Sequence, residues 1–211
     1  MILIGQYDSP FVRRVAISLH HYRIEFEHRP WSVWGNAEQI AQHNPLRRVP
    51  TLVLDDGITL VETFTIFYSV DELVEPSRRL VPVGGGARRD VLRVAALASG
   101  VADKAVTLLY SSLELMKPSD LWRTRCRTQV LETLARLETE RSSPSDEFWF
   151  GGSLSHADIA VACGYRFVSE ALPDLIQPQH FPALAALSSK CEALPEFCSA
   201  YLPITNNLTT A

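Results

Sequence analysis

Cysteine, basic charge and long apolar runs are all scarce in this sequence. Its 211 residues include 4 cysteines with no Cys-x-x-Cys pair, which excludes a disulfide-stabilised scaffold and favours a reducing, cytoplasmic compartment. No apolar run approaches the roughly 18 residues of a membrane span, and the opening MILIGQYD lacks the basic region of a secretory leader. We therefore expect a soluble intracellular protein that does not act in a membrane.

Binding to nucleic acid and to metal ions is also disfavoured. Lysine and arginine number 20 against 24 aspartates and glutamates, so the net charge is −4 and no cationic surplus exists to neutralise phosphates. The 6 histidines show no His-Glu-x-x-His motif or other ligand spacing, so we expect no metal site. Three glycines occur at 84–86, but no Gly-Lys-Ser/Thr follows them, which argues against a phosphate-binding loop.

Apolar side chains make up 46% of the sequence and are spread along it, which is enough for a real core and excludes a disordered chain. In the first 75 residues, short strand patterns alternate with helical ones. Ser9-Pro10 is a helix start signal, and Asp56-Gly57 between two apolar runs predicts a hairpin. The expected order is βαβ-α-ββα, with strands at 1–5, 26–30, 51–54 and 58–61 and helices from 10, over 35–43 and over 63–73.

The rest of the chain is helical in pattern. Residues 76–87 are rich in proline and glycine, and we interpret them as a linker between an α/β domain at 1–75 and an all-helical domain at 88–211. In the second domain, Ser155 and Asp158 fit a capping box directly before an apolar run. The polar tail, 205–211, is expected to fray or to cover a cleft.

Four segments together resemble the cytosolic glutathione S-transferase family. They are SPFVRRV at 9–15, NPLRRVPTL at 44–52, VETFTI at 61–66 and SLSHADIAV at 153–161. Their order and spacing are similar to the family's active-site segment, its Asn-Pro-x-Gly-Lys-Val-Pro motif, its Glu-Ser-x-x-Ile motif and its helical capping box. The resemblance implies a thioredoxin-like domain that binds glutathione, an all-helical domain, a homodimer and a role in detoxification in the cytoplasm.

The activity that the resemblance implies is attack of a glutathione thiolate on a hydrophobic electrophile, with glutathione as co-substrate and no metal. In this family the residue at the start of the first helix faces the thiol, and here that residue is Ser9. A serine before Pro-Phe-Val is also an ordinary helix cap, and both roles can hold because capping uses the oxygen and donation uses its hydrogen. Tyr7 is the rival donor, because some classes use a tyrosine at the end of the first strand.

Further glutathione contacts also follow from the resemblance. Val49-Pro50 corresponds to a cis step that turns the Val49 backbone toward the cysteinyl group, whereas on sequence alone Pro50 is typical of a strand entry. Arg47-Arg48 stands where Gly-Lys is usual, and Arg48 keeps the positive charge for the glycine carboxylate.

Two acidic positions and a threonine complete the expected glutathione site. Glu62 would reach the γ-glutamyl ammonium and Thr63 the γ-glutamyl carboxylate, although Thr63 is equally typical of a helix cap. Similar family members place an acidic residue at Asp103, where it approaches the glutathione of the neighbouring subunit. The alternative for Asp103 is a solvated helix charge paired with Lys104.

The expected contacts of the hydrophobic co-substrate are four side chains that are equally typical of interhelical packing. Arg13 is either a cation of the cleft or, as we expect, a solvated helix charge. The four co-substrate candidates are Phe11, Tyr110, Ser111 and Trp122.

Two other functions stay open on the sequence. A glutathione-dependent thiol-disulfide reductase or peroxidase is one, although members of that branch carry cysteine where Ser9 stands and serine cannot form a mixed disulfide. A non-catalytic binding module is the other, and the Arg47-Arg48 departure is compatible with it.

Overall fold

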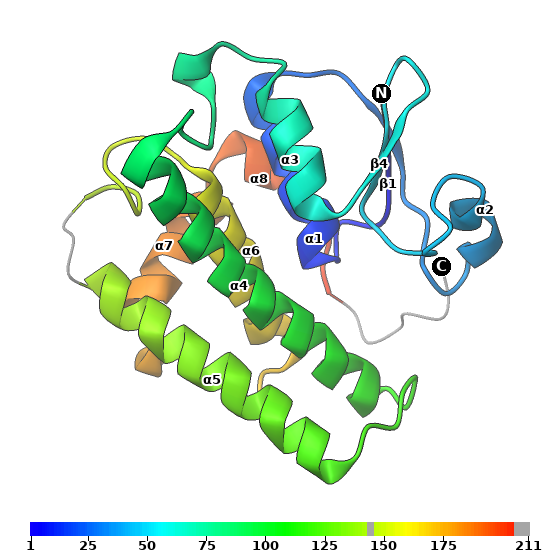
Figure 1. Ribbon diagram of the computed structural model, residues 1–211. Helices are drawn as coiled ribbons and strands as arrows, with labels where there is room; N and C mark the ends of the chain where they lie inside the picture. Colours follow the sequence, from blue (N-terminus) through cyan, green and yellow to red (C-terminus); the bar gives the residue numbers. More distant parts are fainter. Residues whose placement is uncertain (143–145, 205–211) are drawn as a thin grey trace. The chain divides into compact units, whose positions relative to one another are not determined.

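A computed structural model describes residues 1–142 and 146–204 of the protein (Figure 1). The contacts of these residues separate two compact units, one made of Met1–Arg79 with the segment from 194 onward and the other of Leu80–Ala193. Among the described residues, no helix is both long and apolar enough to cross a bilayer. The expectation for the tail at 205–211 concerns residues outside the described part.

The first unit is built on a four-stranded sheet with the order β2-β1-β3-β4. The parallel pair is β1 with β2, in which Leu3 lies opposite His28, and β3 is antiparallel to both β1 and β4. Leu3, Ile4 and Leu52 on the central strands are fully buried. The expected β-strands are all present and shorter than predicted, at Ile2–Ile4 (β1), Glu27–Arg29 (β2), Thr51–Val53 (β3) and Thr59–Val61 (β4).

Three helices accompany the sheet. The helices α1 (Pro10–Tyr22) and α3 (Thr63–Asp71) pack together on one face, and α2 (Ala37–Ala41) lies on the other side of the sheet (Figure 1). The predicted start of α1 is confirmed: Ser9 is its cap and Pro10 its first residue. Arg23, in the left-handed conformation, ends the helix. With this order, βαβ-α-ββα, the first unit is a thioredoxin-like domain.

The described residues of the second unit form four α-helices. They are α4 (Gly85–Ser112), α5 (Asp120–Ser142), α6 (His156–Ala171) and α7 (Pro182–Glu192). The predicted apolar stripes of α4 and α5 are buried, at Val91, Val94, Ala95 and Ala98 and at Val130, Leu134 and Leu137. A Cβ on Gly164 would lie 3.3 Å from the Ala98 carbonyl oxygen, so a glycine there lets α6 approach α4 closely. The helix α4 begins inside the glycine run that the sequence assigns to the linker.

The capping box at the start of α6 is confirmed. The Asp158 carboxylate accepts the Ser155 amide at 2.9 Å, the Ser155 hydroxyl at 2.6 Å and the Trp149 amide at 2.7 Å. Asp158 is fully buried, so these donors satisfy a carboxylate that water does not reach. The box therefore fixes both the first turn of α6 and the loop before it.

The short helix α8 (Pro195–Ser199) follows the helical unit in sequence but packs with the first unit, against α1. From the sequence, these residues are expected in the helical domain, at 88–211. The physical reason for the different grouping is Arg13 of α1, which is buried rather than solvated and donates hydrogen bonds to the carbonyl oxygens of Phe197 and Ala200.

The capping box makes a prediction for stability. Replacing Asp158 by alanine leaves two buried backbone amides without an acceptor, and we expect the free energy of unfolding to fall by about 2–4 kcal/mol. Urea unfolding followed by circular dichroism measures the change. Asp174→Ala, at an exposed aspartate in the turn after α6, is the matched control. A loss below about 1 kcal/mol in Asp158→Ala would contradict the assigned role.

Candidate functional site

Ser9 lies at the point where β1 leads into α1. Its backbone is extended, and its Oγ accepts the amides of Phe11 at 3.3 Å and Val12 at 3.4 Å. These distances are longer than usual for hydrogen bonds to a hydroxyl oxygen, and neither bond uses the hydroxyl hydrogen. The side chain is half-buried. The Ser9 hydroxyl can therefore donate a hydrogen bond to an anion at the N-terminus of α1, where the helix dipole favours negative charge.

Tyr7 occupies the turn after β1 rather than the end of the strand. Its ring stacks on His28 of β2, with centroids 4.0 Å apart and planes 4° from parallel, and His28 Nε2 lies 2.8 Å from the Gly5 carbonyl oxygen. Burial raises the pKa of Tyr7 to about 12. The phenol therefore stays protonated at neutral pH and can act as a donor, which keeps it a rival to Ser9. No local motif marks His28, so its contact with Tyr7 is not predictable from the sequence.

Asp8 lies between the two candidate donors and was also not identified from the sequence. Burial raises the pKa of its carboxyl group, and hydrogen bonds from the backbone amides of Ser9 and Asp8 act in the opposite direction. Because burial is the largest cause, the neutral form of Asp8 is favoured relative to an exposed aspartate.

Gly5 brings the start of α1 against the loop before β3. It has a φ of +129°, and a Cβ at this position would lie 2.5 Å from Val12 Cγ2 and 2.8 Å from Val49 Cβ. Any side chain would force these segments apart. The apolar pattern alone places Gly5 at the end of a strand. The signal for its role is a glycine that lies between an apolar strand and a helix cap.

The expected cis bond at Val49-Pro50 is present. The loop before it is organised by Asn44, which is buried and donates from Nδ2 to the Arg48 carbonyl at 2.9 Å and to Thr51 Oγ1 at 3.0 Å. The Asn44 side-chain oxygen accepts the Leu46 amide at 3.0 Å. One asparagine thus ties both ends of the loop, which accounts for the Asn-Pro part of the motif.

The two arginines of this loop have different partners. Arg47 has a positive φ of 53° and pairs with Glu38 of α2 at 2.5 Å. Arg48 lies 3.8 Å from Glu62, and both of these side chains are largely exposed. The structure therefore brings Arg48 and Glu62 together at the surface, next to the start of α3, and directs Arg47 to another partner.

Glu62 and Thr63 form the entry to α3. Glu62 occupies the cap position with a φ of 69° and makes no side-chain capping bond, and Thr63 is the first helical residue and is buried. The alternative in which Thr63 is the helix cap is therefore wrong, because Glu62 holds the cap position and the helix begins at Thr63, one residue earlier than a threonine cap requires. The N-terminus of α3, where the helix dipole is positive, makes this helix start suitable for a carboxylate ligand.

The remaining candidates lie on separate helices. Phe11 is in the first turn of α1 and half-buried. In the second unit, Asp103, Tyr110 and Ser111 are on α4 at a spacing that places them on one side of it. Asp103 pairs with Lys104 at 2.8 Å, as the alternative reading of the sequence expects.

Trp122 is the candidate on α5, and its ring is 41% exposed. The Lys104 ammonium lies 5.4 Å from the centroid of this ring, which is within the range of a cation–π contact. Lys104 therefore links two of the expected site residues, Asp103 and Trp122. In the described part of the chain, no group of three or more histidine, cysteine or acidic side chains has an arrangement that could hold a metal ion.

Comparison with known proteins agrees with this architecture. Residues 3–78 match the family model for the glutathione S-transferase N-terminal domain, and residues 120–188 match that for the C-terminal domain. Glutathione S-transferase U22 of Arabidopsis thaliana is 24% identical over 201 residues, which cover 90% of this chain and 85% of that protein.

Solved structures are similar over nearly the full chain. A glutathione S-transferase from Methylobacterium radiotolerans, in complex with glutathione sulfonate, matches with a TM-score of 0.87 at 26% identity, covering 97% of this chain and 95% of that one. A glutathione transferase family member from Pseudomonas fluorescens with bound glutathione matches with a TM-score of 0.80 at 29% identity, covering 96% and 99%.

A thioredoxin-like domain with a serine cap and a cis-proline loop, followed by a helical domain, defines a class of two-domain proteins. Within that class, the chain belongs to the glutathione S-transferase family.

The environment of Tyr7 makes a prediction for its titration. Because burial raises its pKa to about 12, the tyrosinate absorbance of the native protein and of Tyr7→Phe should be the same up to about pH 11. In denaturant, where burial is lost, the two proteins should differ by one tyrosinate near pH 10. A tyrosinate that titrates near pH 10 in the native protein and disappears in Tyr7→Phe would contradict the burial of this phenol.

Proposed function

We propose that this protein is a glutathione transferase in which Ser9 stabilises the thiolate of bound glutathione for attack on a hydrophobic electrophile. The observation that carries the proposal is the Ser9 hydroxyl at the N-terminus of α1, whose oxygen accepts two long bonds while its hydrogen is used in neither. The bound glutathione in the similar Pseudomonas structure and the bound glutathione sulfonate in the similar Methylobacterium structure support it.

The magnitudes are sufficient for thiolate activation. A thiol has a pKa of about 8.5, and lowering it by about 2 units requires about 2.7 kcal/mol of differential stabilisation. A hydrogen bond to a charged group supplies about 1.5–3 kcal/mol, and a helix N-terminus adds about 0.3–1 kcal/mol. A neutral hydroxyl and the start of α1 together reach this value, so the sulfur needs no neighbouring cation.

The start of α3 suits the γ-glutamyl end of glutathione. Its carboxylate would accept the Thr63 amide and hydroxyl, and its ammonium would pair with Glu62, whose carboxylate is exposed and already close to a cation, Arg48. Arg48 would bind the glycine carboxylate. The backbone of Val49 would pair with the cysteinyl group, because Gly5 holds this residue against the turn that leads to Ser9.

The thiolate acts as the nucleophile, and holding it next to the second substrate supplies most of the remaining rate increase. The proposed contacts of the electrophile are Phe11 in the first unit and three residues in the second unit, Tyr110, Ser111 and Trp122. A homodimer in which Asp103 approaches the other subunit's glutathione, a cytoplasmic location and a role in detoxification belong to the same proposal, and the family resemblance supports them.

The role of Ser9 is tested by Ser9→Ala and Ser9→Gly. Glycine caps a helix nearly as well as serine, so Ser9→Gly removes the hydroxyl with little loss of stability. In both variants we expect the pKa of the bound thiol to rise and turnover of chlorodinitrobenzene to fall about 10-fold or more, which corresponds to about 1.5 kcal/mol. Thiolate absorbance against pH and steady-state kinetics measure the two effects.

Three results would contradict this assignment. If turnover collapses only in Tyr7→Phe, the phenol is the donor. If the wild-type protein reduces hydroxyethyl disulfide but does not conjugate aromatic halides, the activity is that of a reductase. If calorimetry detects no binding of glutathione at millimolar concentration, the protein is a binding module of another kind.

The role of Glu62 is tested by Glu62→Gln. The substitution keeps the shape and removes the charge that pairs with the γ-glutamyl ammonium, so we expect the Kd for glutathione to rise about 10-fold while kcat at saturation changes less than about twofold. Calorimetry measures the Kd. Glu72→Gln, an exposed glutamate at the other end of α3, is the control and should leave the Kd unchanged. Equal effects of both substitutions would remove Glu62 from the site.

A further inference from the structure

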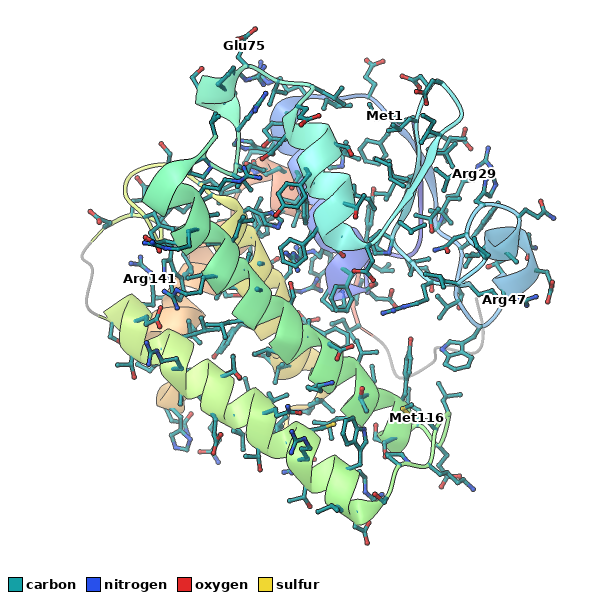
Figure 2. The ribbon with its side chains drawn as sticks, in the orientation of Figure 1. Met1, Arg29, Arg47, Glu75, Met116 and Arg141 are labelled. Atoms are coloured by element: carbon teal, nitrogen blue, oxygen red, sulfur yellow. The ribbon has the colours of Figure 1, made fainter. Side chains whose placement is uncertain are left out.

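The side chain of His28 contacts the turn that leads to Ser9 at two points. His28 lies on β2 next to Arg29, which is labelled in Figure 2. Its Nε2 lies 2.8 Å from the carbonyl oxygen of Gly5, where the turn begins, and its ring stacks on the ring of Tyr7, with centroids 4.0 Å apart. One side chain from the neighbouring strand therefore holds both the start and the middle of this turn.

The hydrogen bond to Gly5 determines which nitrogen of the imidazole carries hydrogen. A carbonyl oxygen can only accept, so Nε2 of His28 is the donor, in the neutral ring as well as in the imidazolium. Gly5 is buried, and a buried carbonyl that loses its donor is costly. The Gly5 amide is also held by β2, because it donates to the Arg29 carbonyl oxygen at 2.9 Å. A glycine has no side chain to pack, so these two hydrogen bonds locate its backbone.

The position of Gly5 in turn affects the position of Ser9. The turn between them is closed by a hydrogen bond from the Ser9 amide to the Gln6 carbonyl oxygen at 3.2 Å. Gly5 also packs closely against the first turn of α1, since a Cβ added to it would lie 2.5 Å from Val12 Cγ2. A displaced Gly5 backbone would therefore move both the turn and the helix start that carries the Ser9 hydroxyl.

We propose that His28 is a positioning residue for thiolate activation: its hydrogen bond to Gly5 keeps the Ser9 hydroxyl directed at the sulfur of glutathione. The inference rests on the proposed function, because it takes Ser9 to be the donor to the sulfur. The stack with Tyr7 orients the imidazole, and the hydrogen bond fixes the turn. His28 acts through the backbone of the turn rather than by touching glutathione.

Two substitutions separate the two contacts of His28. His28→Phe keeps a ring that can stack on Tyr7 and removes the donor, whereas His28→Gln removes the ring and keeps an N–H donor near the position of Nε2. We expect His28→Phe to raise the pKa of the bound thiol by about 0.5–1 unit and to lower kcat for chlorodinitrobenzene about 3–10-fold. The Kd for glutathione should change less than about threefold, because the charged groups of glutathione bind at the start of α3. His28→Gln should restore most of the thiol pKa and of kcat.

Three further measurements distinguish positioning from a general loss of stability. His180→Phe, the same substitution at an exposed histidine of the helical unit, is the control and should change none of these values. In a Ser9→Gly background, His28→Phe should have no further effect on the thiol pKa, because the hydroxyl that it positions is absent. In the wild-type protein, nitrogen-15 NMR should show the neutral ring of His28 as the Nε2–H tautomer.

Four outcomes overturn the proposal. They are an unchanged thiol pKa in His28→Phe, equal effects of His28→Phe and His28→Gln, an effect that persists in the Ser9→Gly background, and an Nδ1–H tautomer in the wild-type protein. The tautomer decides the question even where a variant does not fold. Failure of the proposed function is distinct: the thiol pKa of bound glutathione would respond to His28→Phe as expected, and yet the protein would conjugate no electrophile. If the protein binds no glutathione, both proposals fall.

Discussion

The close contact of Gly5 with Val12 and Val49 is the constraint on which the site depends. Gly5 follows β1 and lies so close to Val12, in the first turn of α1, and to Val49, before Pro50, that a Cβ at this position would overlap both side chains. Two segments separated by about forty residues thereby meet at one helix start. Asn44, buried beneath the second segment, holds that loop from within, so neither side of the contact relies on exposed side chains.

The two candidate hydrogen-bond donors at this helix start, Ser9 and Tyr7, are neutral groups. Ser9 contributes a hydroxyl, Tyr7 stays a phenol because burial raises its pKa, and burial also favours the neutral form of Asp8. Formal charges gather instead around the start of α3, where Arg48 and Glu62 form a surface pair. In the proposed complex, the neutral donors at the start of α1 face the central thiol of glutathione, and the Arg48–Glu62 pair faces the charged groups at its two ends.

The helix α1 also joins distant parts of the chain. Its first residues follow β1, and its middle and end hold α8, which comes from the end of the described chain, through Arg13 and His21. The guanidinium is a planar fork with several donors, which lets one buried side chain satisfy two carbonyls and stack on an aromatic ring. The helix α8 is therefore a component of the thioredoxin-like unit.

The sequence by itself determined the element order, the cap at Ser9, the capping box at Asp158 and the apolar stripes of α4 and α5, because each depends on residues close together in the chain. The cis peptide bond at Val49-Pro50 was predicted from the resemblance to the family. Only the tertiary structure decided that Gly5 packs against both Val49 and the first turn of α1, and that His28 stacks on Tyr7. It also decided that Arg13 is buried and donates hydrogen bonds to the carbonyl oxygens of α8. These contacts join residues far apart in sequence, and no local pattern encodes the partner of a buried arginine or a close backbone approach.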